Sequence, residues 1–260
     1  MKNILSTLLI LTLILIFPAL TTSQVVHAQN PYADFIRQLD TLKETKLKRT
    51  PIIRQNRMDS DGVPLKDYYV PQEAIEEYVA CFDRLRLTLP DATVQCYYCH
   101  SWSGGQPYLV ASTLSIDSLL NIVDISFKSI LDSAAHQFMV PAEDTPMAYF
   151  QYLVFKEYGE QFALYWHAFY GVKKILLQHP DDNDENLFGK LTVTNEPLYE
   201  SSRGDAILPV VRMDDKYCYI TLFESNHENI RQVEYCIKRT EPWRIMSDER
   251  VMAEQPPIAY

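Results

Sequence analysis

"YCYITLFESNHENIRQVEYCIK", residues 217–238, is the stretch of sequence that decides the fold class of this chain. Apolar and polar residues alternate on each side of the polar segment "ESNHEN", and aromatic and β-branched residues are frequent in both halves. Alternation with period two is typical of a strand that buries one face, and a short polar segment between two such runs indicates a turn. The stretch therefore predicts a hairpin of two antiparallel strands.

The register of this hairpin follows from its apolar residues. Side chains of a strand point alternately to its two faces, so Cys218 and Ile220 share a face on the first strand, as Tyr235 and Ile237 do on the second. If both apolar faces pack on one core, Ile220 lies opposite Tyr235 and Cys218 lies opposite Ile237, because a slip by one residue would expose one of the two sets. Cys236 then points to the other face, and we predict no disulfide between Cys218 and Cys236.

Outward from the hairpin, the segments after Pro180 keep the same character. They are short, rich in β-branched and aromatic residues, and separated by residues that favour turns, which predicts further antiparallel strands. These segments are "KLTVTNEPL" (190–198), "AILPVVRM" (206–213) and "PWRIMS" (242–247). The C-terminal part of the chain is therefore expected to form an antiparallel sheet.

Before Pro180 the apolar residues recur at spacings of three and four, which predicts helices. The clearest start is Thr145, which suits the capping position, followed by Pro146 at the first helical position. The helical pattern continues through residues 145–178, and apolar residues lie on nearly every side of it. We expect one long helix that runs through the middle of the domain.

Shorter helical segments precede this one. Residues 71–87 begin with Pro71 in a first-turn position, and residues 115–138 begin with Ser115 as a cap. Nearer the N-terminus, an amphipathic helix is expected on Phe35, Ile36, Leu39 and Leu42, before a basic and polar connection that extends to residue 70. Together these elements predict an α+β fold, in which N-terminal helices are followed by a curved, cone-like antiparallel β-sheet.

The first 28 residues have the pattern of a secretory signal peptide. Lys2 provides the positive charge that precedes the apolar segment of a signal peptide, and residues 4–20 form a mostly apolar run. Cleavage after Ala28 would make Gln29 the first residue of the mature protein. A membrane anchor is the alternative, since the apolar run approaches spanning length. We expect a secreted or periplasmic protein without a stable membrane anchor after cleavage. The expected divisions are 1–28 as the signal, 29–70 as the helical segment and connection, 71–252 as the α+β domain, and 253–260 as a tail.

The composition is that of a folded protein with an acidic surface. Hydrophobic residues make up 47% of the chain and aromatic residues 12%, which is sufficient for a sizeable core. The net charge of −10 gives no general attraction to phosphate backbones, so we do not expect a nucleic acid as partner.

The order of helices followed by a meander that ends in "RQVEYCIKRTEPWRI", residues 231–245, resembles the nuclear transport factor two-like superfamily. The resemblance covers roughly residues 145–252. It implies a cone of helices packed into a curved sheet, with a concave and largely apolar pocket that binds a ligand or, in some members, carries out acid–base chemistry. No position matches a defined catalytic motif of the family, so no catalytic residue is carried over.

An aromatic pocket between the long helix and the concave face of the sheet is the expected binding site. Its candidate lining residues are Tyr149, Tyr152, Tyr165, Trp166 and His167. Simple packing of these side chains in the core is the alternative interpretation. The pattern favours a non-catalytic module that binds an unidentified small molecule or protein and needs no cofactor.

"CYYCH", residues 96–100, provides the competing hypothesis, because Cys-x-x-Cys-His is the signature of covalent c-type haem attachment. Cys96 and Cys99 would form the thioethers, His100 would be the axial ligand, and Met139 or Met147 the distal one. A structural cysteine pair, a zinc site without a local fourth ligand, and a thiol-based redox site remain open alternatives.

No motif of a common enzyme class supports catalysis. The sequence contains no phosphate-binding Gly-x-x-x-x-Gly-Lys loop, no Gly-x-Ser-x-Gly elbow and no His-Glu-x-x-His helix. A binding module is therefore favoured over an enzyme, and a redox protein that uses the "CYYCH" motif is the alternative.

Overall fold

The computed structural model describes residues 29–58, 64–101, 104–114, 138–180 and 191–255. Within these ranges, helices and strands are mixed, and the largest element is an open antiparallel sheet of six strands, which confirms the α+β class. The predicted signal peptide and the helix expected at 115–138 lie outside the described residues, apart from Phe138.

The six-stranded sheet is built around the predicted hairpin. Its order is β10-β11-β12-β13-β9, and β8 pairs with β11 beside this path. The strands are β8 (Lys174–Ile175), β9 (Thr192–Val193), β10 (Val210–Met213), β11 (Tyr217–Ser225), β12 (Asn229–Lys238) and β13 (Ile245–Glu254). β13 continues two residues beyond the expected end of the domain at residue 252.

The predicted register of the hairpin is confirmed. Cys218 pairs with Ile237 and Ile220 pairs with Tyr235. Cys218 is fully buried on the face that carries Ile220, whereas Cys236 lies opposite Tyr219 and is partly exposed. Both cysteines are free, as the alternation of side chains requires.

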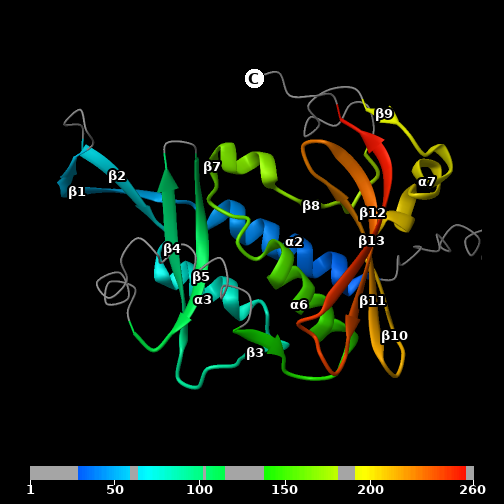
Figure 1. The fold of residues 1–260 in the computed structure, drawn as a ribbon, viewed down its shortest axis with the longest axis horizontal. Coiled ribbons are helices and arrows are strands. Elements are labelled where there is room, and N and C mark those ends of the chain that lie inside the picture. Colours follow the sequence, from blue (N-terminus) through cyan, green and yellow to red (C-terminus); the bar gives the residue numbers. More distant parts are fainter. Residues whose placement is uncertain (1–28, 59–63, 102–103, 115–137, 181–190, 256–260) are drawn as a thin grey trace, which may run out of the picture.

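Four helices are present in the described part of the chain: α2 (Pro31–Thr45), α3 (Gln72–Ala80), α6 (Pro146–Tyr158) and α7 (Glu196–Ser201). Figure 1 shows α2 and α6 in the middle of the molecule, between the six-stranded sheet and a three-stranded sheet. The three-stranded sheet consists of β4 (Thr93–Ser101), β5 (Gly104–Ser112) and β7 (Tyr165–Trp166), and two-stranded pairs are formed by β1 (Thr50–Met58) with β2 (Pro64–Tyr69) and by β3 (Leu85–Leu87) with β6 (Met139–Pro141).

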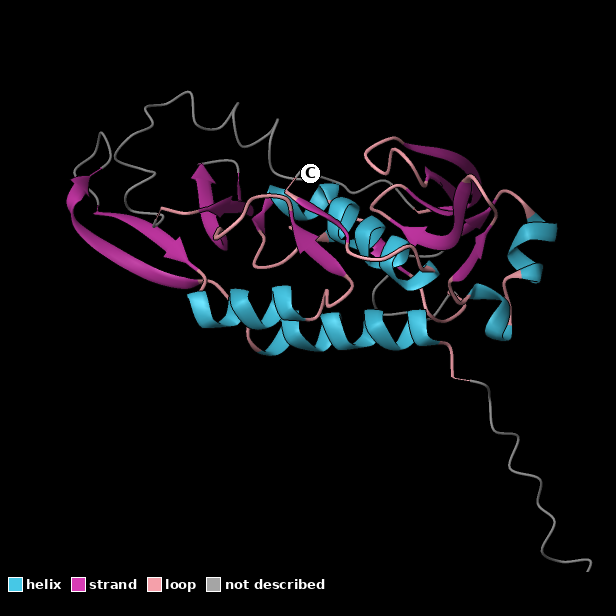
Figure 2. Ribbon diagram, turned by 90° about the horizontal axis from the view of Figure 1, so that it is seen from below, coloured by secondary structure: helices cyan, strands magenta, loops and turns pink. Residues whose placement is uncertain are grey.

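Helix α6 is the centre of the core, as its apolar residues predict. Thr145 caps it by accepting a hydrogen bond from the backbone N–H of Ala148 at 3.4 Å, and Pro146 is its first residue. Figure 2 shows α6 next to a layer formed by α2 and α3, with strands on either side of it. Phe150 contacts the rings of Tyr32 and Phe35 on α2, so the helix is covered on the side away from the sheet.

The length expected for this helix was wrong, because α6 ends at Tyr158 rather than near residue 178. Tyr78 donates a hydrogen bond to the carbonyl of Gly159, and Tyr98 donates one to the carbonyl of Ala163, both at 3.0 Å. Ala163 has a φ of 51°, which an α-helix does not admit. Side chains from distant segments thus occupy carbonyl groups that would accept backbone hydrogen bonds if the helix continued.

The expectations for two shorter segments were also wrong. The helix expected over 71–87 stops at Ala80, and Leu85–Leu87 instead forms β3 against β6. The segment expected as a loose polar connection contains the β1–β2 hairpin. In both places pairing with a partner strand overrides the local pattern.

A second core lies on the other face of the large sheet. Phe223, Ile230 and Met252 project there and pack with Leu198 of α7 and Ile207 of the short helix η3 (Gly204–Ile207). Both faces of the sheet are thus partly covered, and the face toward α6 is the one that carries the polar groups described below.

Leu153 provides a direct test of the central position of α6. Its side chain is fully buried within the main core, so Leu153→Ala should lower the free energy of unfolding by about 2–5 kcal/mol. The exposed Leu89 is the control, for which the same substitution should change the free energy by less than about 0.5 kcal/mol. Equal effects in chemical denaturation would show that α6 does not occupy the core.

Candidate functional site

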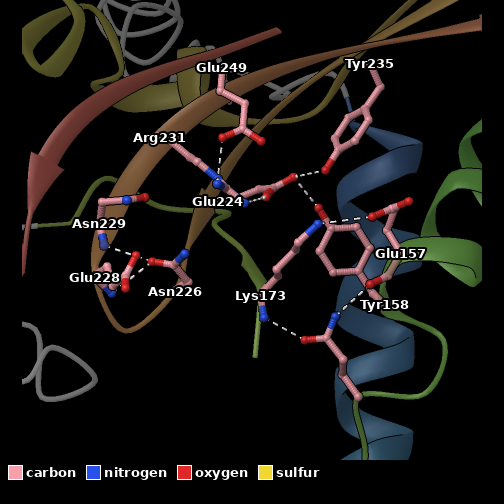
Figure 3. Close-up of polar contacts among 11 residues, drawn as sticks. Glu157, Tyr158, Lys173, Glu224, Asn226, Glu228, Asn229, Arg231, Tyr235 and Glu249 are labelled. Carbon is pink, nitrogen blue, oxygen red and sulfur yellow. Dashed lines mark hydrogen bonds and ion pairs between the residues drawn. The ribbon is translucent and has the colours of Figure 1, made fainter. Parts of the chain in front are cut away.

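A carboxylate is buried in the middle of the large sheet. Glu224 lies on β11 and has no exposed surface, and Arg231 on β12 is its direct cross-strand partner. One carboxylate oxygen, Oε1, accepts hydrogen bonds from the hydroxyls of Tyr158 and Tyr235, the latter at 2.6 Å. The other oxygen, Oε2, lies 3.3 Å from Nη2 of Arg231 (Figure 3).

The local sequence explains why this charge is buried. Cys218, Ile220, Leu222 and Glu224 are alternate residues of β11, so all four face the core. Burying a carboxylate without partners is strongly unfavourable. Here the partners come from two elements, since Tyr158 is the last residue of α6, while the other two donors lie on β12.

The two tyrosines act as donors over the whole ordinary pH range. Burial raises the pKa of Tyr158 well above its usual value, and the neighbouring Glu224 raises it further. The pKa of Tyr235 is raised for the same two reasons in the same order. Both hydroxyls therefore stay protonated and available to the carboxylate at neutral pH.

Arg231 extends the buried network to the surface. Its Nη1 lies 2.7 Å from Oε2 of Glu249 on β13, and the side chain of Glu249 is 44% exposed. The hairpin turn holds this arrangement in register, because Oδ1 of Asn226 accepts hydrogen bonds from the backbone N–H groups of Glu228 and Asn229 at 2.9 and 2.8 Å (Figure 3).

A cavity of about 540 Å³ lies beside this network. Its walls are the last turn of α6, the chain just before β8, the ends of β11 and β12, the β12–β13 turn and β13. The lining side chains include Lys156, Glu157, Lys173, Tyr235, Trp243 and Glu249. Tyr235 and Glu249 belong to both the network and the cavity, so the buried carboxylate fixes two groups of the cavity wall.

A second set of contacts fixes the wall next to α6. Nζ of Lys173 lies 3.1 Å from Oε2 of Glu157, and both side chains are partly buried. Gln161 joins the two segments, because its Oε1 accepts from the backbone N–H of Lys173 at 2.6 Å and its Nε2 donates to the carbonyl of Glu157 at 2.8 Å. Lys173 is therefore held at the cavity by both its backbone and its side chain (Figure 3).

The five aromatic candidates from the sequence do not meet at this cavity. Tyr149 and Tyr152 are buried in the core on α6, and burial together with Asp144 raises the pKa of Tyr149 to about 12. Tyr165 and Trp166 form β7, which pairs with β5 at Gly105 and Gly104. His167 follows them in the short helix η2 (His167–Gly171). The early end of α6 separates the two groups, so Tyr149 and Tyr152 lie on α6 while the other three lie on β7 and η2 instead of the same helix.

The "CYYCH" residues lie on β4, which pairs with β5 residue by residue from Thr93 to Ser101. The side chains of Cys99 and His100 lie outside what the structure describes. Burial raises the pKa of the Cys96 thiol. Met139 is buried on β6, while Met147 lies at the start of α6. The haem hypothesis stays a prediction, and among the described residues no three or more His, Cys, Asp or Glu side chains are grouped so that they could hold a metal ion.

Sequence analysis missed the network, although one signal was present. In the alternating run of β11, Glu224 occupies the position where the next apolar residue is expected. A charged residue in the buried phase of a strand indicates a paired or functional group. Its partner Tyr158 was not recognisable, because the end of α6 depends on contacts from distant segments.

Comparison with protein-family models, with curated proteins and with solved structures found no match to this chain. Among the described residues, the helices are too short or too polar to cross a membrane.

Replacing the buried carboxylate should destabilise the folded protein. Glu224→Gln leaves the guanidinium of Arg231 facing an amide and removes the charge that both hydroxyls bind, so the free energy of unfolding should fall by roughly 3 kcal/mol. Glu249→Gln is the matched control at the exposed end, with an expected change below about 1 kcal/mol. Equal changes in urea denaturation would show that the buried position has no special role.

Alkaline pH should weaken the fold through the two tyrosines. Their pKa values are raised in the folded protein, so their contribution is complete below about pH 10, the unfolded value, and is lost as the pH rises further. The Tyr235→Phe variant should show a shallower decline of unfolding free energy above pH 10, by up to about 1.4 kcal/mol per pH unit. In contrast, Tyr217→Phe, outside the network, should keep the wild-type slope; a wild-type slope in the Tyr235 variant would contradict the assignment.

Proposed function

We propose that this protein is an exported, non-catalytic module that binds a small molecule in the cavity between α6 and the β12–β13 hairpin. The observation that carries the proposal is a cavity of about 540 Å³ whose wall includes Tyr235 and Glu249, two groups fixed by the buried Glu224 network. Ligand sites are commonly preformed clefts of about 300–1,000 Å³ with a few fixed polar groups.

Binding is favoured over catalysis by the properties of the polar groups. Glu224 has no exposed surface and cannot touch a ligand. The pKa of Tyr235 is shifted away from neutral pH, which suits a hydrogen-bonding group better than a general base. Glu157 and Glu249 are held in ion pairs with Lys173 and Arg231. These groups are arranged to orient a ligand.

The resemblance to the nuclear transport factor two-like superfamily supports the same proposal, since it implies a pocket on the concave face of the sheet. The cavity differs from that expectation in being lined by charged as well as aromatic side chains. The expected site residues on α6, β7 and η2 are replaced in this proposal by residues from α6, β12 and β13.

A variant that fills the cavity tests the proposal. Ser247 lies opposite Tyr235 on β13 and lines the cavity, so Ser247→Trp should abolish binding. The probes are D-glucose, D-glucuronate, D-glucose 6-phosphate, benzoate and L-lysine, each at about 10 mM, where a ligand with a Kd near 1 mM stabilises by about 1.4 kcal/mol. We expect at least one probe to raise the melting temperature of the wild-type protein but not of this variant.

Asp248→Trp provides the control, because position 248 is exposed on the same strand and pairs with Glu234 on the opposite face. This control should respond to the probes as the wild-type protein does. A shift that persists in Ser247→Trp, or no shift with any probe, would refute binding at this cavity.

A further inference from the structure

The part of the cavity next to the β12–β13 turn, called the cationic mouth and defined by Lys156, Lys238 and Arg244, carries unbalanced positive charge. Lys238 and Arg244 share one carboxylate, Glu241, with N–O distances of 2.6 and 3.5 Å. Lys156 donates a hydrogen bond from Nζ to the backbone carbonyl of Trp243 at 3.1 Å, and it has no ion pair with any described residue. Lys156, Lys238 and Arg244 thus line this part of the cavity with a single carboxylate partner among them, in a chain whose net charge is −10.

The part of the cavity wall formed by α6 and β13 has the opposite character. Glu157 and Glu249 place carboxylates there, and Ser247 adds a hydroxyl. Glu249 binds Arg231 through Oε2, while its Oε1 makes no hydrogen bond with the described residues. Carboxylate oxygens of this kind accept hydrogen bonds from ligand hydroxyls. A second negative charge on a ligand would be repelled beside these two carboxylates.

The rim provides an aromatic surface. The side chain of Trp243 lines the cavity and is 58% exposed, which is unusual for a residue of this size. A flat indole beside hydrogen-bonding groups suits a ligand with one apolar face and one polar edge. The C–H face of a sugar ring has this form.

We propose that the cavity binds a sugar acid, with its carboxylate at Lys156, Lys238 and Arg244 and its hydroxyls toward Glu157 and Glu249. This inference rests on the proposed function and adds the ligand class. A neutral sugar leaves the cationic mouth unused, and an apolar anion leaves the carboxylates of Glu157 and Glu249 without donors. A phosphate ester brings a second negative charge toward Glu157 and Glu249.

Calorimetric titration of the full exported chain with D-glucuronate and D-glucose tests the inference, since the two probes differ at one carbon. Glucuronate should bind at least about tenfold more tightly, the effect of one good charged contact. Lys156→Gln and Lys238→Gln should each weaken glucuronate binding by about fivefold or more and leave glucose binding unchanged, with less effect at high salt. Lys46→Gln is the control, because Lys46 is exposed and pairs with Glu77 away from the cavity.

The other outcomes separate this inference from the proposed function. Equal affinity for glucose and glucuronate would overturn the assignment of the cationic mouth. Tighter binding of D-glucose 6-phosphate would overturn the choice of a carboxylate. If neither sugar binds while benzoate or L-lysine gives a stabilisation that Ser247→Trp removes, the sugar-acid inference fails and the proposed function stands.

Discussion

The buried carboxylate of Glu224 is the constraint on which the rest of the structure depends. A charge with no exposed surface must be matched by donors, and here they are the hydroxyls of Tyr158 and Tyr235 and the guanidinium of Arg231. Tyr158 ends α6, whereas the other two donors lie on β12. The carboxylate therefore fixes where the central helix meets the sheet.

The cavity follows from that junction. Tyr235 has its hydroxyl on Glu224 and also lines the cavity, and Arg231 carries the network to Glu249 on the cavity wall. The last turn of α6 adds Lys156 and Glu157 to the opposite side. A site assembled in this way is held by the core of the protein, which keeps its polar groups in place before any ligand arrives.

Features that depend on neighbouring residues in the sequence were predicted, whereas features that depend on contacts between distant segments were missed. Alternation in residues 217–238 determined the hairpin register, and the Thr145-Pro146 pair marked the start of α6. The end of α6 was missed, because hydrogen bonds from Tyr78 and Tyr98 stabilise the chain after it. The aromatic candidates at 165–167 were consequently placed on the wrong element, while the charged residue at 224 was the one local signal of the site.

The most direct test of the central claim is a double-mutant cycle between Tyr158→Phe and Glu224→Gln, read as the free energy of unfolding. If the carboxylate ties α6 to the sheet, the two losses are coupled by at least about 1 kcal/mol, since Tyr158→Phe removes the donor and Glu224→Gln removes the charge of the same hydrogen bond. Additive losses, within about 0.3–0.5 kcal/mol, would mean that the two residues stabilise the protein independently, and would contradict the account.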